Sequence, residues 1–362
     1  MAWGSPDVTR RRIQDDQTVS YNAGTATQSL QHVGLLKSLT MRYNATYAYT
    51  KSIGGSTQDA KGPFNALSNV NLKVNGVGTF LDTDGWNLYL FNLVHYQPMD
   101  PASSDNPNVP QTVATTSYFS FPSVPAASGN ITELFQLRFP FTVEIAGIKE
   151  IGLFILQNDE INLQVTPQFN KNAGSTTALA APYDEAGGDT FALGTPTLDL
   201  VREFYGVPGN KSDYPTIGWF HQVTTTRISV TSTQTDCPIV KGGIVLRVIY
   251  SLVDGSTPSL MSNSNISSLQ WLYGSNDTPY DESITDVLIR QHEDYKHDLP
   301  QGVLTHDFFG HAKQTMRDTF DTMKYQNLRG RIITPSTPNS GSYVDVTVEK
   351  LIPIGPNPES LY

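Results

Sequence analysis

Two stretches of the sequence resemble each other: LDLVREFY at residues 198–205 and VDVTVEKL at residues 344–351. In each, an aspartate follows an apolar residue and a glutamate comes four positions later, with an offset of 146 residues between the two stretches. Alternating apolar and polar residues predict a β-strand with one buried face. Because a repeat at a fixed offset indicates a duplicated unit, we expect two tandem β-sandwiches, each packing two sheets around one core.

Further strands are predicted on both sides of these stretches. WNLYLFNLVHY at residues 86–96 has apolar residues on both faces, so we expect a strand buried on both sides, preceded by a hairpin turn in DTDG at residues 82–85. Apolar residues at helical spacing predict a helix over residues 281–298. The other predicted strands are 36–50, 71–79, 134–146, 150–169, 191–205, 226–235, 242–253, 303–309, 325–333 and 343–352.

Changes in composition divide the chain. GVPGNKSDYP at residues 206–215 is typical of a linker, because Gly and Pro interrupt regular structure. Three polar stretches are too long for ordinary connections, so we expect surface excursions at 97–130, 171–188 and 254–280. The predicted organisation is an N-terminal helix or arm (1–30), a first sandwich (31–206), a linker (206–216), a second sandwich (217–355) and a C-terminal tail (356–362).

The basic run in SPDVTRRRIQDD, residues 5–16, stands out in an acidic chain. Ser5 and Pro6 suit the start of a helix, and acidic residues four positions after two of the arginines would form i,i+4 pairs. We therefore expect a short N-terminal helix with balanced charge. It is interpreted either as a solvated face or as a contact with a neighbouring subunit or lipid headgroups, made by Arg10, Arg11, Arg12, Asp15 and Asp16.

Composition narrows the classes of function. The chain of 362 residues has a formal net charge of -10, which argues against direct binding of nucleic acid. Its single cysteine, Cys237, excludes an intrachain disulfide. The sequence shows neither a secretory signal nor an apolar run long enough to span a membrane, so we expect folding in a cytosol and no secretion.

A search for reactive constellations assigns no catalytic, cofactor-binding or metal-binding residue. Neither G-x-S-x-G nor H-E-x-x-H occurs in the sequence. Several histidines and aspartates gather near the C-terminal end, but the histidine pairs are five residues apart, whereas helical metal ligands are three or four apart. They are His292, His297, His306 and His311, with Asp294, Asp298 and Asp307.

The layout resembles a known family. Two consecutive sandwich-like units follow an N-terminal segment, and the chain closes with LPQGVLTHDFFG (299–310), RDTFDT (317–322) and YVDVTVEKLIPI (343–354). It is similar to the double jelly-roll major capsid proteins of tailless double-stranded DNA viruses with an internal membrane, and most similar to tectivirus-like phages. The resemblance implies an all-β fold of two tandem jelly-roll β-sandwiches, with a short N-terminal helix and a few other short helices.

The resemblance also implies a function and partners. Three chains would form a pseudo-hexagonal trimeric capsomer that tiles an icosahedral shell over an internal membrane, in contact with neighbouring capsomers, penton proteins and minor capsid proteins. The protein would then belong to the virion, be assembled in the host cytoplasm, need no cofactor and not be an enzyme. Two alternatives remain: a phage receptor-binding or fibre-type jelly-roll protein, and a glycan-processing hydrolase on paired sandwiches, which would need two carboxylates in one cleft.

Overall fold

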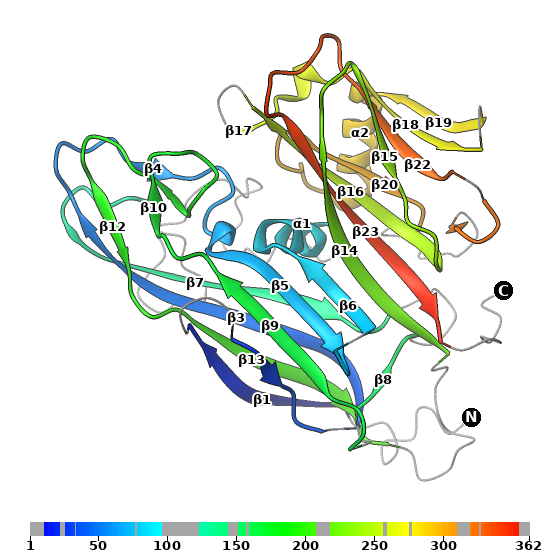
Figure 1. The fold of residues 1–362 in the computed structure, drawn as a ribbon, viewed down its shortest axis with the longest axis horizontal. Helices are drawn as coiled ribbons and strands as arrows, with labels where there is room; N and C mark the ends of the chain where they lie inside the picture. Colours follow the sequence, from blue (N-terminus) through cyan, green and yellow to red (C-terminus); the bar gives the residue numbers. More distant parts are fainter. Residues whose placement is uncertain are drawn as a thin grey trace. The chain divides into compact units, whose positions relative to one another are not determined.

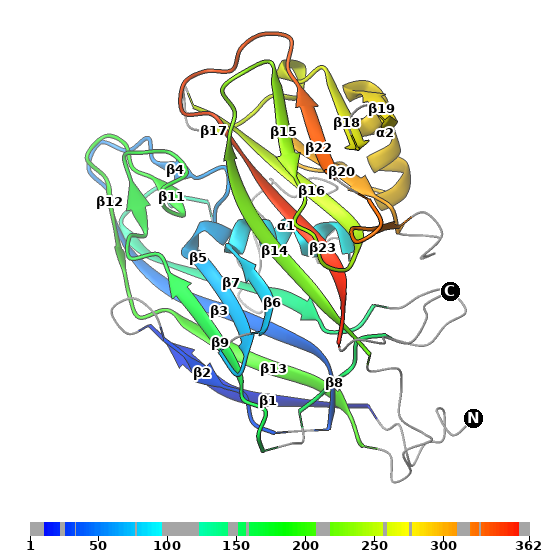
Figure 2. The same ribbon diagram turned by 45° about the vertical axis from the view of Figure 1, so that its right-hand side comes forward.

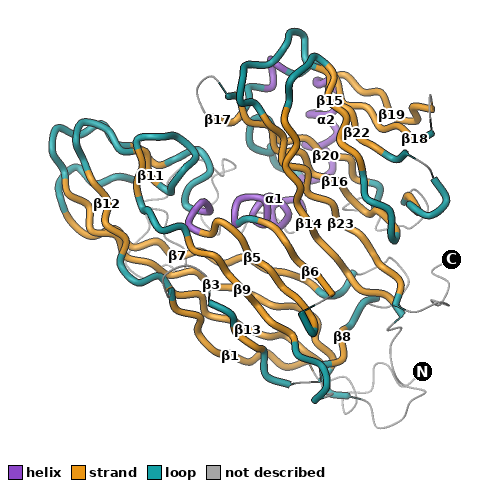
Figure 3. Tube along the Cα trace, viewed as in Figure 1, coloured by secondary structure: helices purple, strands orange, loops and turns teal. Residues whose placement is uncertain are grey.

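The computed structural model describes residues 11–21, 26–32, 34–76, 78–95, 123–143, 151–156, 159–207, 218–255, 259–274, 277–309, 319–325 and 327–354. Strands dominate these residues, and their α-helices are short (Figure 3). They form two compact units: the first ends at His221 and the second begins at Gln222, except that Leu90–His95 belong to the second. No helix among the described residues is long and apolar enough to cross a membrane.

The first unit contains two four-stranded arrangements (Figure 1). In one, β3 (Leu35–Thr50) is the central strand: β13 (Thr197–Tyr205) lies on one side of it with β1 (Arg11–Ser20) beyond, and β7 (Gly129–Pro140) lies on the other. The other runs in the order β2, β9, β5, β6, with bounds Gln28–Ser29, Leu163–Phe169, Leu67–Val74 and Gly78–Thr83. Shorter strands complete the unit: β4 (Thr57–Gln58), β8 (Phe154–Ile155), β10 (Gly174–Ser175), β11 (Tyr183–Asp184) and β12 (Thr190–Leu193).

The second unit repeats this arrangement. Here β16 (Ile244–Asp254) is central, with β23 (Tyr343–Pro353) and then β14 (Trp219–Ser229) on one side and β20 (Val303–Asp307) on the other. The second sheet runs in the order β15, β22, β18, β19, with bounds Gln234–Pro238, Arg329–Ile333, Ser268–Tyr273 and Asp277–Ser283. Two short strands, β17 (Ser259–Leu260) and β21 (Phe320–Asp321), also pair with β16.

The two units therefore share one topology. When the eight main strands of each unit are counted along the chain, one sheet holds the first, eighth, third and sixth, and the other holds the second, seventh, fourth and fifth. This is the jelly-roll order, in which two antiparallel sheets enclose one core. The repeated sequence stretches form the eighth strand of each unit, β13 and β23. The predicted all-β fold of two tandem jelly rolls is confirmed.

In each half of the chain a helix follows the fifth of these strands and precedes the sixth. The second of these helices, α2 (Ile284–Tyr295), confirms the helix predicted over residues 281–298. Ser283 caps its start, because the Ser283 side chain accepts a hydrogen bond from the backbone N–H of Asp286 at 3.3 Å. In Figure 2, α2 lies beside β18 and β19, and its buried side chains are Val287, Gln291 and Tyr295, spaced four apart on one face.

The prediction of a strand over residues 86–96 is wrong, because Gly85–His95 form the helix α1. The segment is apolar all round, and a short run of this kind has the same pattern in a buried helix and in a buried strand. The predicted hairpin turn in DTDG is also wrong, because β6 ends at Thr83 and the helix begins at Gly85. The Asp84 carboxylate instead accepts a hydrogen bond from the Asn87 N–H at 2.7 Å, and so caps the start of α1.

The N-terminal helix predicted over the basic run is also corrected, because Arg11–Ser20 form strand β1. This strand pairs antiparallel with β13, Arg11 opposite Tyr205, and the exposed edge of β13 supplies backbone partners that an isolated helix lacks. Four residues along a strand span about 13 Å, so Arg11 and Asp15 cannot form the predicted i,i+4 pair. Residues 1–10, including Ser5, Pro6 and Arg10, lie outside the described residues.

Several other boundaries differ from the predictions, including those of the single strands predicted over 191–205 and 226–235, each of which covers parts of two strands. The predicted excursion over 254–280 contains β17, β18 and part of β19. In β18 half-buried polar residues lie between buried apolar ones, whereas β19 alternates exposed and half-buried positions. The single strand predicted over 71–79 is a hairpin of β5 and β6, because the chain reverses after Val74 and pairs it with Gly78. Most of the predicted linker and the whole C-terminal tail lie outside the described residues.

This hairpin depends on a backbone conformation that favours glycine. Gly76 has φ of +70°, and a Cβ atom built on it meets nothing within 4 Å, so only the backbone resists a side chain. We expect Gly76→Ala to lower the free energy of unfolding by about 1 kcal/mol. Gly129→Ala is the matched control, since a Cβ there also meets nothing and no positive φ is required. Urea denaturation that showed equal effects for the two variants would contradict this assignment.

Candidate functional site

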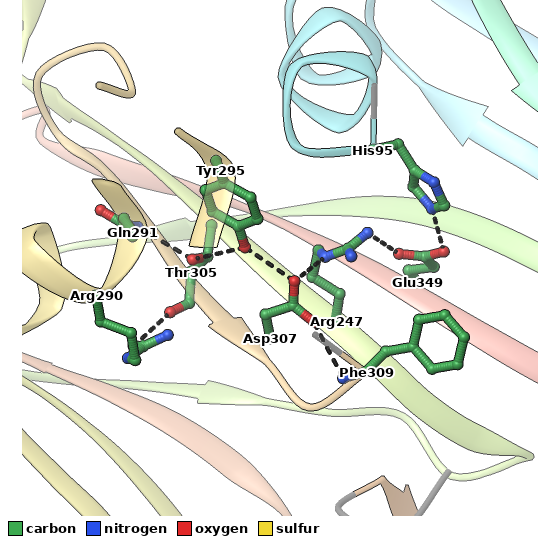
Figure 4. A network of polar contacts seen from close by, with 9 residues as sticks. All are labelled: His95, Arg247, Arg290, Gln291, Tyr295, Thr305, Asp307, Phe309 and Glu349. Atoms are coloured by element: carbon green, nitrogen blue, oxygen red, sulfur yellow. Dashed lines mark hydrogen bonds and ion pairs between the residues drawn. The ribbon is translucent and has the colours of Figure 1, made fainter. Parts of the chain in front are cut away.

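A buried polar network surrounds Arg247 in the second unit (Figure 4). Strand β16 places Arg247 opposite Asp307 of β20 and opposite Glu349 of β23. The guanidinium donates from Nε to Asp307 Oδ2 at 2.9 Å and from Nη1 to Glu349 Oε2 at 2.8 Å. All three side chains are at most 3% exposed. One cation thus joins three neighbouring strands inside the protein.

The network continues onto helix α2. The Tyr295 hydroxyl donates to Asp307 Oδ2 at 3.1 Å, and Gln291 Nε2 donates to Thr305 Oγ1 at 3.1 Å. Arg290 adds a bond from Nη2 to the Thr305 carbonyl at 3.1 Å. These side chains come from the C-terminal half of the helix and all reach β20, as Figure 4 shows. The contacts fix the position of α2 along the strand.

A histidine completes the network at its other end. His95, in the last turn of α1, lies with Nε2 2.6 Å from Glu349 Oε1. Burial by itself would lower the pKa of Arg247, but the carboxylates of Asp307 and Glu349 outweigh this effect and raise it above its ordinary value. Burial also raises the pKa of Tyr295, with a further contribution from Asp307. Arg247 is therefore a permanent cation between two carboxylates.

The chemistry of this network is structural. Its charged groups are directed at each other, and at 0–3% exposure Arg247, Asp307 and Glu349 are closed to a substrate. General acid–base catalysis requires a group within hydrogen-bonding reach of the substrate, directly or through one water. The arrangement stabilises the pairing of β16 with β20 and β23 and the packing of α2 against β20.

The repeated acidic residues form polar contacts in both units. Glu203 of β13 matches Glu349, and it accepts from Arg138 Nη2 at 2.7 Å and pairs with Arg11 Nε at 2.6 Å. The repeated aspartates also bond to the first strand of their own unit. Thr18 of β1 donates to Asp199 at 2.7 Å, and Arg227 of β14 donates to Asp345 at 2.7 and 3.0 Å. The repeat therefore corresponds to polar contacts between neighbouring strands.

The structure separates the residues predicted as an N-terminal contact surface. Arg11 forms the ion pair with Glu203, and Asp15 lies 4.0 Å from Arg42. Arg12 is exposed, whereas Arg10 and the side chain of Asp16 lie outside the described part of the chain. Their contact with lipid or with another subunit stays a prediction, and Arg11 already has a partner within its own unit.

The described histidines near the C-terminal end have separate partners. His292 is exposed and lies 2.8 Å from Asp298, while His297 Nδ1 contacts the Tyr295 carbonyl at 2.8 Å. His306 is buried next to the Tyr250 hydroxyl, and burial lowers its pKa to about 3. His311 lies outside the described residues. The three described histidines therefore serve different local contacts.

The sequence contains a local signal for the Arg247 network. Arg247 interrupts an otherwise apolar strand, IVLRVIYSLV, at residues 244–253. A buried arginine requires carboxylate partners, because an unpaired buried charge is very costly. The strand therefore indicated a buried ion pair, although its partners are distant in sequence.

No protein-family model and no curated protein matches the sequence. Among solved structures, the chain is similar to the MCP of STIV, Sulfolobus turreted icosahedral virus, with a TM-score of 0.68 and 12% identity over 95% of this chain and 97% of that one. It is also similar to the major capsid protein P2 of bacteriophage PM2 (TM-score 0.53, 11% identity, 96% and 99% covered) and to a chain of the PBCV-1 virus capsid (TM-score 0.60, 9% identity, 95% and 93% covered).

The chain has the double jelly-roll fold. The similarity extends over both units, because it covers at least 95% of this chain in each of these three structures. At 9–12% identity this similarity establishes the fold alone. The same fold follows from the strand order and agrees with the family resemblance of the sequence.

Proposed function

We propose that this double jelly-roll protein is the major capsid protein of an icosahedral double-stranded DNA virus. The observation that carries the proposal is the near-complete mutual coverage with capsid proteins, 95% of this chain and 97% of the STIV protein. Fold alone does not determine function, but both jelly rolls and their tandem arrangement are shared. A structural role also agrees with the Arg247 network, whose charged side chains are enclosed by the protein.

The proposed capsomer is a homotrimer. Two units of one topology in each chain give six similar sandwiches in a trimer, and so a pseudo-hexagonal outline that can tile a shell. Neighbouring capsomers, penton proteins and minor capsid proteins are the proposed partners.

The proposed location is the virion, after assembly in the host cytoplasm, as a shell over an internal membrane. The net charge of -10 disfavours close contact with nucleic acid, and a membrane between shell and genome would make such contact unnecessary. In this role the protein binds other proteins and lipid, needs no cofactor and catalyses no reaction.

The native mass of the purified chain tests the proposal directly. We expect light scattering to give three times the chain mass of 39.8 kDa, unchanged on dilution at low and moderate salt. Electron microscopy of the same fraction should show particles with a hexagonal outline. A monomer at every concentration would contradict the proposal and would favour a receptor-binding or fibre-type jelly-roll protein.

A further inference from the structure

One end of the second unit exposes three large aliphatic side chains on segments that are distant in sequence. Val240 follows β15 and is 72% exposed, Met323 follows β21 and is 70% exposed, and Ile354 follows β23 and is 50% exposed. Most aliphatic side chains of this unit lie in its core, so exposure of this extent requires an explanation. We call these three residues, with Lys241 and Lys324, the apolar–basic patch.

Hydrogen bonds hold the segments of the patch together. Thr322 Oγ1 accepts from the Gly242 N–H at 2.9 Å and donates to the Gly243 carbonyl at 2.8 Å, which joins the turn after β15 to the turn after β21. Ile244 of β16 pairs with Leu351 of β23 and with Asp321 of β21. The backbone therefore presents Val240, Met323 and the end of β23 at the same end of the unit.

The charge of the patch is opposite to that of the whole chain. Lys241 is exposed, and the Lys324 side chain is 69% exposed, 3.6 Å from its partner Asp321. The Lys350 ammonium donates a hydrogen bond to the Val240 carbonyl at 3.5 Å, in the turn after β15. Residues 239–243, 320–325 and 350–354 thus contain three lysines and one carboxylate, in a protein with a net charge of -10.

We propose that the apolar–basic patch rests on the surface of a lipid bilayer that contains anionic headgroups. Aliphatic side chains can enter the boundary between headgroups and acyl chains while lysines remain among the anionic headgroups. A protein partner fits less well, because the cores of protein interfaces are enriched in aromatic residues, methionine and arginine and depleted in lysine, whereas the patch contains two lysines, no aromatic residue and no arginine. The inference deepens the proposed function, since it rests on a shell that lies over a membrane.

The patch is a better lipid contact than the basic run that the sequence singled out. Arg11 is paired with Glu203 at 2.6 Å, and Asp15 on the same strand carries an opposing charge. Among the described residues of β1, Ile13 is the exposed large hydrophobic side chain, at 61%. The patch combines three such side chains with two exposed lysines.

Sedimentation with vesicles tests the proposal. The purified full chain is mixed with vesicles of phosphatidylcholine that contain about one third phosphatidylglycerol, and with vesicles of phosphatidylcholine alone, at low salt. We expect binding to the anionic vesicles and about five-fold weaker binding for each of Lys241→Gln and Lys324→Gln. The triple variant Val240→Ser, Met323→Ser, Ile354→Ser should lose at least ten-fold. Raising the salt should weaken the binding of the native chain.

A matched control removes three exposed aliphatic side chains elsewhere: Ile13→Ser, Ile53→Ser, Ile289→Ser, at 61%, 84% and 53% exposure. This variant should bind vesicles as the native chain does, and both triple variants should keep the native melting temperature. Equal losses in the two variants, or no binding by the native chain, would overturn the proposal. A change of native mass in the patch variant with intact vesicle binding would also overturn it, because the patch would then be a contact between copies. The mass of the native chain separately decides whether the capsomer proposal stands.

Discussion

Replacing Arg247 with alanine should lower the free energy of unfolding by about 3–5 kcal/mol. The substitution leaves Asp307 and Glu349, which are 0% and 3% exposed, without the cation that compensates their charge. Removal of one partner from a buried ion pair is costly, because the remaining charge stays away from water. Urea denaturation followed by tryptophan fluorescence measures the effect.

Arg331→Ala is the control for this prediction. Arg331 pairs with Asp236 at 2.5 Å on the same unit, but the side chains are 24% and 44% exposed, so we expect a loss of at most about 1 kcal/mol. A second test neutralises the whole site as Arg247→Met, Asp307→Asn, Glu349→Gln, which should recover at least half of the lost stability. If Arg247→Ala cost no more than Arg331→Ala, the network would not be a main source of stability.

Replacing Glu133 with glutamine should stabilise the first unit increasingly as the pH rises. Glu133 of β7 is fully buried, and its Oε2 accepts a hydrogen bond from the Tyr47 hydroxyl at 2.8 Å. Burial raises the pKa of Glu133 to about 8, although the hydroxyl groups of Tyr183 and Tyr47 act in the opposite direction. In the unfolded chain the pKa is about 4.3. The folded protein therefore keeps the proton over a pH range in which the unfolded chain releases it.

The direction of the pH effect on stability follows from this difference between the folded and unfolded pKa of Glu133. Below about pH 4 both states carry the proton, and between that pH and about 8 the unfolded state is favoured by about 1.4 kcal/mol per pH unit. Glutamine cannot ionise, so the stability gap between Glu133→Gln and the native chain should grow by about 4 kcal/mol from about pH 5 to about pH 8. Urea denaturation at the two pH values measures this gap.

Glu160→Gln makes the same chemical change at an exposed position. Its stability gap to the native chain should stay within about 0.5 kcal/mol at both pH values. A gap for Glu133→Gln that is the same at both pH values would show that Glu133 is ionised in the folded protein. The buried carboxyl would then have a compensating partner in the fold.

Several elements could be predicted from sequence because their signals are local. The strand predictions around residues 36–50, 242–253 and 343–352 match β3, β16 and β23, whose alternating or continuously apolar residues fit a sheet. Helix α2 combined a polar cap at Ser283 with an amphipathic face. The repeated LDLVREFY and VDVTVEKL stretches correctly indicated two units.

Other elements depend on partners that are distant along the chain. Helix α1 has the same apolar pattern as a buried strand, and β1 contains a locally reasonable helix start that pairing with β13 overrides. Asn75 and Gly76 are a typical hairpin-turn pair, but apolar residues continue on both sides of the turn, so the two strands resemble one continuous strand.

The residue pattern predicted an all-β chain of two tandem sandwiches, the position of their last strands and the acidic pair that each of these strands carries. The groups that those acids contact are visible only in the folded chain. Arg247 bonds to Asp307 and Glu349 across 60 and 102 residues, and the patch at Val240, Met323 and Ile354 joins three distant segments. The physical reason is that hydrophobic periodicity is a property of neighbouring residues, whereas ion pairs and surfaces form between strands that the topology brings together.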